Sequence, residues 1–535
     1  MQNNQFTSNS GNAVIVPADS FRRHLRRAGI VFACLGIFLS AVLLYSRQNN
    51  FSSVYHPDEY LKGIQLLTNK RLYLHPPLLL EGTELGLKIS QQQPAADKIG
   101  VRQVILTGRW VSAVFAALSV VAFALIGYGY GGFAGFWLTG LSVGLCPSIL
   151  LSAHFMKEDT ALLLGLAITL LALLVYSKAA TRRIRIYGLV FVGAAAGIAV
   201  SGKYIGIVAL IAGLAFVLLP VESPNAFVRA GLVLLGFVVA TVLINYRIFV
   251  DWSAFKGGLG YEVNRTLSRQ SLGTIMNRPN LFAMAALFRE TMPHVLALAG
   301  AFAVLLGLFW RKSTTWDLFL VLFALGYSVM LSFSVVPVYR YNLPVIALLH
   351  LMAALAVIKY TMVPERPRNW AVVLAGIALI VLFQARRCRN YLEQFANDSH
   401  VQLRSFIAQN VPRGFAIAAD AYAIQEHDDD PRLAESERQL PVRLTISYWV
   451  ADLGDYDALR ATGVDLIAVS ESAFGRFFDS YVWPSPNDTQ HQRRRRFYEQ
   501  LFAQGELVWA SDPDLPTYSF INPELRLYRV SRRSR

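Results

Sequence analysis

The sequence predicts a mainly α-helical protein: a polytopic transmembrane helical bundle of about eleven spans, followed by a small soluble C-terminal α/β domain. Three observations support this fold class. Of the 535 residues, 54% are hydrophobic and only 16% are charged, whereas soluble proteins carry about 25% charged residues. Apolar stretches of about 16–22 residues, long enough for a helix to cross ~30 Å of hydrocarbon, recur up to residue 385. The composition then changes: residues 1–385 hold 31 basic and 14 acidic side chains, and residues 386–535 hold 19 and 21.

Residues 1–27 are predicted to form a cytoplasmic tail and residues 28–385 the transmembrane domain. Four arginines between positions 22 and 27 precede the first apolar run. By the positive-inside rule they place the N-terminus in the cytoplasm. The predicted spans are 28–46, 104–127, 133–151, 160–178, 187–201, 205–220, 230–250, 293–310, 317–336, 342–360 and 370–385.

The alternation of loops supports this topology. The basic loops 178–185, 311–312 and 365–368 all fall on the cytoplasmic side, as the same rule requires. Arg386 and Arg387, which follow the last span, are the one observation against it. An odd number of spans places the soluble domain outside the cytoplasm. We therefore predict an integral protein of the bacterial inner (plasma) membrane, with a cytoplasmic N-terminus and an extracytoplasmic C-terminal domain.

The C-terminal domain (386–535) is predicted to be a small α/β unit. Short apolar runs bounded by polar residues indicate strands, and a longer amphipathic run indicates a helix. The predicted strands are 414–419, 465–470, 505–510 and 525–530, and the predicted helix is 491–504. We expect Asp428–Asp430 to be an exposed loop, with a metal site as the alternative. Arg493–Arg496 are expected to form a solvated helix face rather than a nucleic-acid site, because the domain has a net charge of −2.

Unusual polar residues collect in the loops that this topology places outside. Ionisable groups at membrane depth are costly, so they usually serve a site or a pathway. The alternative is that they cap helix ends, and three histidines leave a divalent metal open although no two have local ligand spacing. No other cofactor is predicted. The residues are His56, Asp58, Glu59, His75, Lys157, Asp159, Lys203, Tyr204, Tyr339, Arg340 and Tyr341.

Five motifs in order resemble the GT-C glycosyltransferases, and among them the bacterial type of the dolichyl-phosphate-mannose-protein mannosyltransferase family. The chain departs from the eukaryotic members at Leu79-Leu80-Glu81, where a Gly-Lys pair usually follows, so the acceptor stays open. The motifs are Asp58-Glu59, His75-Pro76-Pro77-Leu78, Lys157-Glu158-Asp159, Gly202-Lys203-Tyr204 and Arg340-Tyr341-Asn342-Leu343-Pro344.

The resemblance implies roles for these positions. Asp58 matches the aspartate expected to act as general base, and Asp159 matches an acidic position that shapes the site; Glu59 is grouped with them as catalytic. Lys203 and Arg340 match basic positions suited to the donor phosphate. Physical logic adds Lys157, because a departing phosphate needs cations. The remaining residues are predicted to shape the substrate site: His56, His75, Tyr204, Tyr339 and Tyr341.

The sequence therefore predicts an inverting glycosyltransferase that moves a sugar from a polyprenyl-phosphate donor to an acceptor hydroxyl at the outer membrane face. The acceptor (protein, lipid or glycan) is open, membrane lipids are the surroundings and no nucleic-acid partner is expected. Loop 251–292 is interpreted either as a lid or as a contact with anionic lipid. Two rival functions are a lipid or solute transporter, which should show related halves or mid-span charges, and a non-catalytic envelope assembly subunit.

Overall fold

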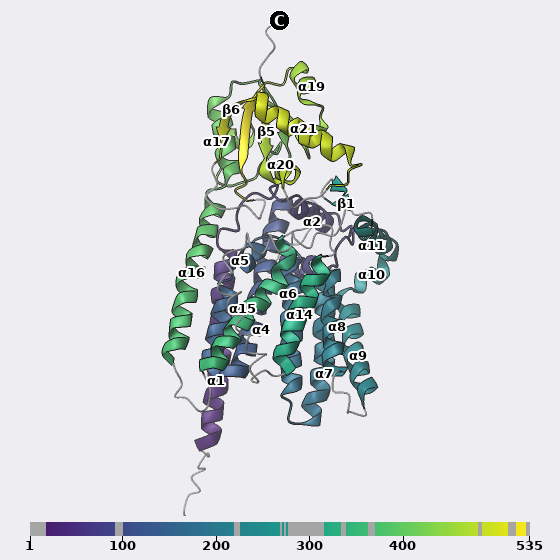
Figure 1. Ribbon diagram of the computed structural model, residues 1–535, viewed down its shortest axis with the longest axis vertical. Helices are drawn as coiled ribbons and strands as arrows, with labels where there is room; N and C mark the ends of the chain where they lie inside the picture. The colour runs from purple at the N-terminus through teal and green to yellow at the C-terminus, as the bar shows by residue number, and fades with distance from the viewer. Residues whose placement is uncertain are drawn as a thin grey trace, which may run out of the picture.

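The computed structural model describes residues 18–90, 100–218, 225–267, 270–271, 274–275, 315–332, 339–361, 370–479, 484–511 and 521–530. Figure 1 shows a helical bundle with a small sheet-containing domain at one end of its long axis. The long helix α16 (Trp370–Ala396) flanks the bundle and leads into that domain. This helix continues across the predicted domain boundary at 385/386.

The bundle is built from helices that follow one another with short connections. Pro57 and Pro147 each occupy the first position of a helix, where proline is well tolerated. The described helices are α1 (Ala18–Ser46), α2 (Pro57–Leu67), α3 (Leu78–Ile89), α4 (Val101–Gly144), α5 (Pro147–Ala153), α6 (Asp159–Ser177), α7 (Arg182–Gly202), η1 (Tyr204–Gly206), α8 (Ile207–Leu218), α9 (Ala226–Ile244), α10 (Tyr246–Val250), α11 (Trp252–Leu267), α14 (Thr315–Ser332), η3 (Tyr339–Asn342) and α15 (Leu343–Thr361). A two-stranded ribbon joins β1 (Gln270–Ser271) to β2 (Thr274–Ile275).

Six helices in the described part of the chain are long and apolar enough to cross a membrane, and two shorter apolar helices accompany them. The six are Arg27–Ser46, Val101–Gly144, Asp159–Ser177, Arg182–Gly202, Ala226–Ile244 and Arg340–Lys359, and the shorter two are Tyr204–Leu218 and Trp316–Leu331. The protein is an integral membrane protein. The predicted span 293–310 lies outside the described residues, and the total of about eleven spans stays a prediction.

The predicted boundary between the second and third spans is confirmed: the stretch labelled α4 consists of two helical segments that meet at Gly131 and Gly132, where the backbone is not helical and Gly132 has φ 60°. The third span does not run to residue 151 as predicted. It ends at Gly144, and a separate helix α5 begins at Pro147. Glycine accepts the left-handed backbone of the bend, and proline starts a helix but cannot continue one, so the break follows from the residues.

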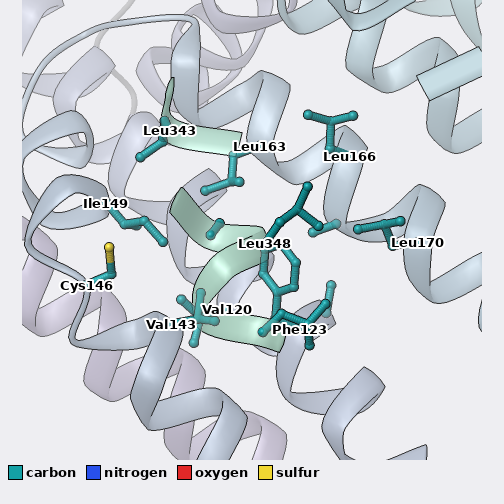
Figure 2. Packing of buried hydrophobic residues seen from close by; sticks show 14 of the residues in the cluster. Val120, Phe123, Val143, Cys146, Ile149, Leu163, Leu166, Leu170, Leu343 and Leu348 are labelled. Atoms are coloured by element: carbon teal, nitrogen blue, oxygen red, sulfur yellow. The ribbon is translucent and has the colours of Figure 1, made fainter. Parts of the chain in front are cut away.

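Helix packing in the bundle depends on small residues. A Cβ at Gly193 of α7 would lie 1.8 Å from the carbonyl oxygen of Val233, and one at Gly236 of α9 would lie 2.0 Å from that of Val190. The two backbones therefore touch, as is common between helices in membranes. Figure 2 shows the apolar core between α4, α5, α6 and α15, with Phe123, Leu163 and Leu348 among the labelled side chains.

The C-terminal domain contains a five-stranded sheet in the order β4-β3-β5-β7-β6. The first three strands are parallel and the last two are antiparallel to their neighbours. The four predicted strands are confirmed, and the edge strand β4 was missed because its exposed alternation is short. The strands are β3 (Ala416–Asp420), β4 (Arg443–Ser447), β5 (Leu466–Ser470), β6 (Glu506–Ala510) and β7 (Leu525–Arg529), and the helices α17 (Ser399–Asn410), α18 (Glu435–Arg438), η4 (Val450–Asp452), α19 (Tyr456–Ala461), α20 (Glu471–Phe478) and α21 (Thr489–Gln504).

Two predictions about charged residues of this domain need correction. Asp428 and Asp430 are buried, so the acidic turn is not an exposed loop. Arg494 is also buried; it pairs with Asp452 at 2.9 Å and lies over the ring of Trp449. Its neighbours at 493 and 495 are about half exposed, as predicted for a solvated face. In both places, exposure to solvent was predicted wrongly from charge alone, because an oppositely charged partner lies elsewhere in the chain.

Candidate active site

The candidate site begins where α2 starts, just after the first long helix. His56 is the N-cap, and its Nδ1 accepts a hydrogen bond of 3.2 Å from the backbone N–H of Asp58. Pro57 occupies the first helical position, where its missing N–H costs nothing. The cap fixes the direction in which α2 leaves the loop. It thereby places Asp58 and Glu59 in the first turn, with their side chains in different surroundings.

Asp58 faces a group of cations at the open side of the site. Its side chain is 47% exposed and forms an ion pair with Lys157, a residue that is itself buried. Arg340 lies on another side, with Nη2 at 3.8 Å from Oδ2 of Asp58. The Lys157 ammonium holds the pKa of the Asp58 carboxyl well below its usual range. Burial lowers the pKa of Lys157, and the charge of Arg340 lowers it further.

Asp159 is the second carboxylate of the site and begins α6. It is 3% exposed, and Nζ of Lys203 lies 2.6 Å from its Oδ1. Lys203 also lies 4.2 Å from the ring centroid of Tyr341, a cation–π distance. Nε of Arg340 lies 3.9 Å from Oδ2 of Asp159. Arg340 therefore lies between both carboxylates and joins the two ion pairs into one cluster.

We name the three basic residues Lys157, Lys203 and Arg340 the cation cluster. They come from the α5–α6 connection, the end of α7 and η3, which are far apart in the sequence. Their carboxylate partners are Asp58 and Asp159. Three positive charges therefore face two negative ones, and the net charge of +1 allows the site to bind an added anion.

Glu59 points away from this cluster into the protein. Its carboxylate makes a two-pronged ion pair with Arg109 of α4, at 3.0 and 2.7 Å, and both side chains are fully buried. Glu59 also accepts a hydrogen bond of 2.6 Å from the backbone N–H of Met156. A carboxylate enclosed in this way does not reach a substrate. We therefore assign Glu59 a positioning role in place of the catalytic one that the sequence suggested.

A second buried pair supports the same segments. Lys62 of α2 lies 2.8 Å from Glu158 and donates to the carbonyl of Met156 at 3.0 Å. Burial would raise the pKa of Glu158, but the Lys62 ammonium outweighs it and keeps that pKa low. Burial lowers the pKa of His75 to about 4, so its imidazole is neutral near pH 7. Glu158, the N-cap of α6, therefore also forms a buried ion pair with Lys62 of α2.

The remaining predicted residues divide between the site and its surroundings. His56 lies 3.5 Å from Nη1 of Arg340, and burial lowers the pKa of His56 well below its usual value. Tyr204 instead donates a 2.9 Å hydrogen bond to the carbonyl of Tyr73 and so holds a loop. Tyr339 begins η3, and its side chain lies outside the described part of the structure.

A divalent metal, which the sequence left open, would have to displace cations already in place. Asp58 and Asp159 are each paired with a lysine. Among the described residues no group of three or more His, Cys, Asp or Glu side chains could hold a metal ion. The donor set therefore fits an anionic ligand better than a metal.

Three neighbours of the site were missed from the sequence. Arg109 carried a usable signal, because it is an arginine inside a predicted span. Lys62 carried little signal, since lysines are common on short amphipathic helices. Glu262 of α11, in the loop interpreted as a lid, lies near enough to Lys203 and Asp58 for their charges to act on it. Burial raises the pKa of Glu262.

Crystal structures of ArnT from Cupriavidus metallidurans resemble this chain over nearly its whole length. Bound to undecaprenyl phosphate, ArnT has a TM-score of 0.51 and 16% sequence identity, with 93% of this chain and 98% of that chain covered. In the apo state the TM-score is 0.50 and the identity 16%, with 92% and 97% covered. The chain has the same overall fold as ArnT.

The shared fold supports the predicted fold class, a mainly helical membrane protein, whereas the number of spans and the domain layout stay predictions. At 16% identity the likeness concerns the fold and assigns no residue of this chain. No protein-family model matches the chain, and no curated protein matches it.

Proposed function

We propose that this protein is an inverting glycosyltransferase that moves a sugar from a polyprenyl phosphate to an acceptor hydroxyl at the outer face of the membrane. The observation that carries the proposal is the cation cluster, three basic side chains gathered around Asp58 and Asp159. Such a site can hold a phosphate beside a carboxylate that is still accessible. The fold of ArnT, whose crystal structure contains undecaprenyl phosphate, supports a lipid-phosphate donor.

In the proposed reaction, Asp58 takes the proton of the acceptor hydroxyl. The hydroxyl oxygen then forms a bond to the anomeric carbon of the donor. The bond from that carbon to the phosphate oxygen breaks, and its electron pair leaves with the phosphate. Lys203 and Arg340 stabilise the negative charge that collects there, as positioned cations do in other phosphate-leaving reactions. One displacement from the face opposite the phosphate inverts the configuration.

The Asp58–Lys157 ion pair has a consequence for this chemistry. A carboxylate with a strongly lowered pKa is ionised but is a weak base. A donor phosphate that draws Lys157 toward itself would weaken the pair and raise the basicity of Asp58. In this proposal the enzyme gains its full base only when the donor is bound.

The replacement Asp58→Asn tests the proposal. Membranes carrying this variant are assayed with a panel of labelled polyprenyl-phosphate sugars, and transfer should fall about 10²–10⁴-fold, the usual contribution of a positioned base. Asp457→Asn, an exposed aspartate of α19, is the matched control and should retain wild-type transfer. Undiminished transfer by Asp58→Asn would remove Asp58 as the base. The anomeric configuration of the product, read by nuclear magnetic resonance, tests inversion separately.

The transporter alternative makes a different prediction for the same variant. In a transporter, replacing Asp58 would change the movement of lipid across the membrane without any sugar transfer in the wild type. The ion pairs of the site join the starts of α2, α6 and α15 rather than helix centres, which favours the enzyme. Comparison of envelope glycans between wild-type and deletion cells by mass spectrometry distinguishes the glycosyltransferase from the transporter. It also identifies the sugar and the acceptor.

A further inference from the structure

The C-terminal domain contacts the loop that carries Asp58, and it does so through the acidic turn, Asp428–Asp430. The backbone N–H of Ser53 donates to Oδ1 of Asp429 at 2.7 Å, and the hydroxyls of Ser52 and Ser53 also donate to Asp429. The backbone N–H of Ser52 donates to Asp430 at 3.2 Å. These bonds join residues more than 370 positions apart in the sequence.

The same segment of loop is held from the opposite side by the bundle. Arg109 donates to the carbonyl oxygens of Asn49, Phe51 and Ser52 at 2.9, 2.8 and 2.9 Å. The N–H groups of Ser52 and Ser53 therefore bond to the C-terminal domain, and three C=O groups of the segment bond to a transmembrane helix. A backbone fixed on both edges has little freedom to shift.

Two further contacts extend the attachment toward Asp58. Tyr55 stacks on His400 of α17, with ring centroids 4.2 Å apart, and its hydroxyl lies 3.4 Å from Asp430. At the other end, Arg102 of α4 donates to the backbone carbonyl and the carboxylate of Asp429 at 2.7 and 2.9 Å. The attachment thus ends three residues before Asp58, with only His56 and Pro57 between.

We propose that Asp429 and Asp430 are positioning residues for the reaction, so that the C-terminal domain completes the active site instead of merely following it in the chain. The inference depends on the proposed function. Its physical basis is that a displacement of about 1 Å at a catalytic group can cost ~10²-fold in rate. The acidic turn supplies the anchors that place the Asp58 carboxylate relative to the cation cluster.

The test compares Asp429→Asn with Arg102→Gln in the full-length protein, and Asp457→Asn is the control. Both test variants should lower kcat for sugar transfer roughly 10–100-fold. The Kd for undecaprenyl phosphate should change less than about twofold, because the cation cluster lies on other elements. Amide hydrogen exchange at Ser52 and Ser53 should become about tenfold faster in Asp429→Asn.

The outcomes separate this inference from the proposed function. Faster exchange with unchanged kcat would overturn the positioning role and leave the glycosyltransferase intact. Unchanged exchange would overturn the attachment itself. Loss of phosphate binding together with kcat in both variants would show general unfolding and also overturn the positioning role. A wild-type protein that transfers no sugar would overturn the proposed function, and this inference with it.

Discussion

Asp58 and Glu59 are neighbours in the sequence, yet the structure gives their carboxylates opposite surroundings. Asp58 is about half exposed and pairs with the cation cluster, whose positive charge exceeds the negative charge of its two carboxylate partners. Glu59 is fully buried, and Arg109 uses all five of its N–H donors on Glu59 and three backbone carbonyls. The comparison teaches that adjacent acidic residues can have different tasks, with one carboxylate accessible beside the cation cluster and the next one holding the loop in place.

The largest effect should follow from breaking the buried pair. Replacing Arg109 by Met leaves the Glu59 carboxylate uncompensated in the interior, which should lower the free energy of unfolding by about 3–5 kcal/mol. Asp58→Asn should cost far less, because the Asp58 side chain is partly exposed. Denaturation of the purified proteins in mixed detergent measures both.

A double variant sharpens this contrast. Glu59→Leu combined with Arg109→Met removes both charges, and it should recover part of the stability that Arg109→Met loses, since an apolar pair avoids the cost of an unpaired buried charge. Equal losses for Glu59→Gln and Asp58→Asn would contradict the division between the two carboxylates.

A smaller effect is expected from the partner of Asp58. Lys157→Met should lower sugar transfer roughly 10–100-fold, because the donor phosphate loses a hydrogen bond from a charged group, which contributes ~1.5–3 kcal/mol. This loss outweighs the basicity that Asp58 gains. It should also change the pH profile. Transfer needs an ionised Asp58, whose pKa lies well below its usual range in the wild type. Without Lys157 that pKa rises, so an acid limb should appear near the ordinary carboxyl value of about 4.

The control for this experiment is Lys88→Met, which removes an exposed lysine of α3 outside the cation cluster. Initial rates from about pH 3 to pH 8, a range that starts below the ordinary carboxyl pKa of about 4 and extends well above it, distinguish the variants. A wild-type profile that already falls near pH 4 would contradict the role given to Lys157.

The sequence predicted the helical bundle well because lipid demands long apolar runs, and these are visible without a structure. It also selected residues that the structure brings together, since Asp58, Lys157 and Lys203 stand out as charges beside apolar segments. Their roles in a reaction stay predictions. It did not separate the roles of Asp58 and Glu59. That difference depends on Arg109, which is 50 positions away from Glu59. No local pattern contains such a pairing.

The acidic turn shows the same limit in the C-terminal domain. Asp428–Asp430 resemble a solvated loop in composition, but Ser52, Ser53 and Arg102 supply partners from the opposite end of the chain. Burial of a charge follows from its partners, and partners at long range are fixed only by the fold. Exposure was therefore predicted wrongly where residue type was the only guide.

The smallest expected effect concerns pH and the contact between the two domains. Both ring nitrogens of His400 face acceptors, with Nδ1 at 2.6 Å from Asp398 and Nε2 at 2.9 Å from the carbonyl of Tyr422. Both nitrogens must donate, so His400 is an imidazolium in this arrangement. Burial lowers the pKa of His400, but the Asp398 carboxylate outweighs it, and the net pKa lies above the ordinary value of 6.5.

Because the pKa is higher in the folded state, His400 stabilises the fold fully below its unfolded pKa of about 6.5 and loses this contribution as pH rises through the folded value. The melting temperature of wild type minus that of His400→Gln should therefore be largest near pH 6 and should shrink toward alkaline pH. Carboxyl groups titrate in both proteins and have the opposite effect on the melting temperature as pH changes. Taking the difference between wild type and variant cancels their contribution. A difference that grows with pH would mean that His400 is neutral in the folded protein.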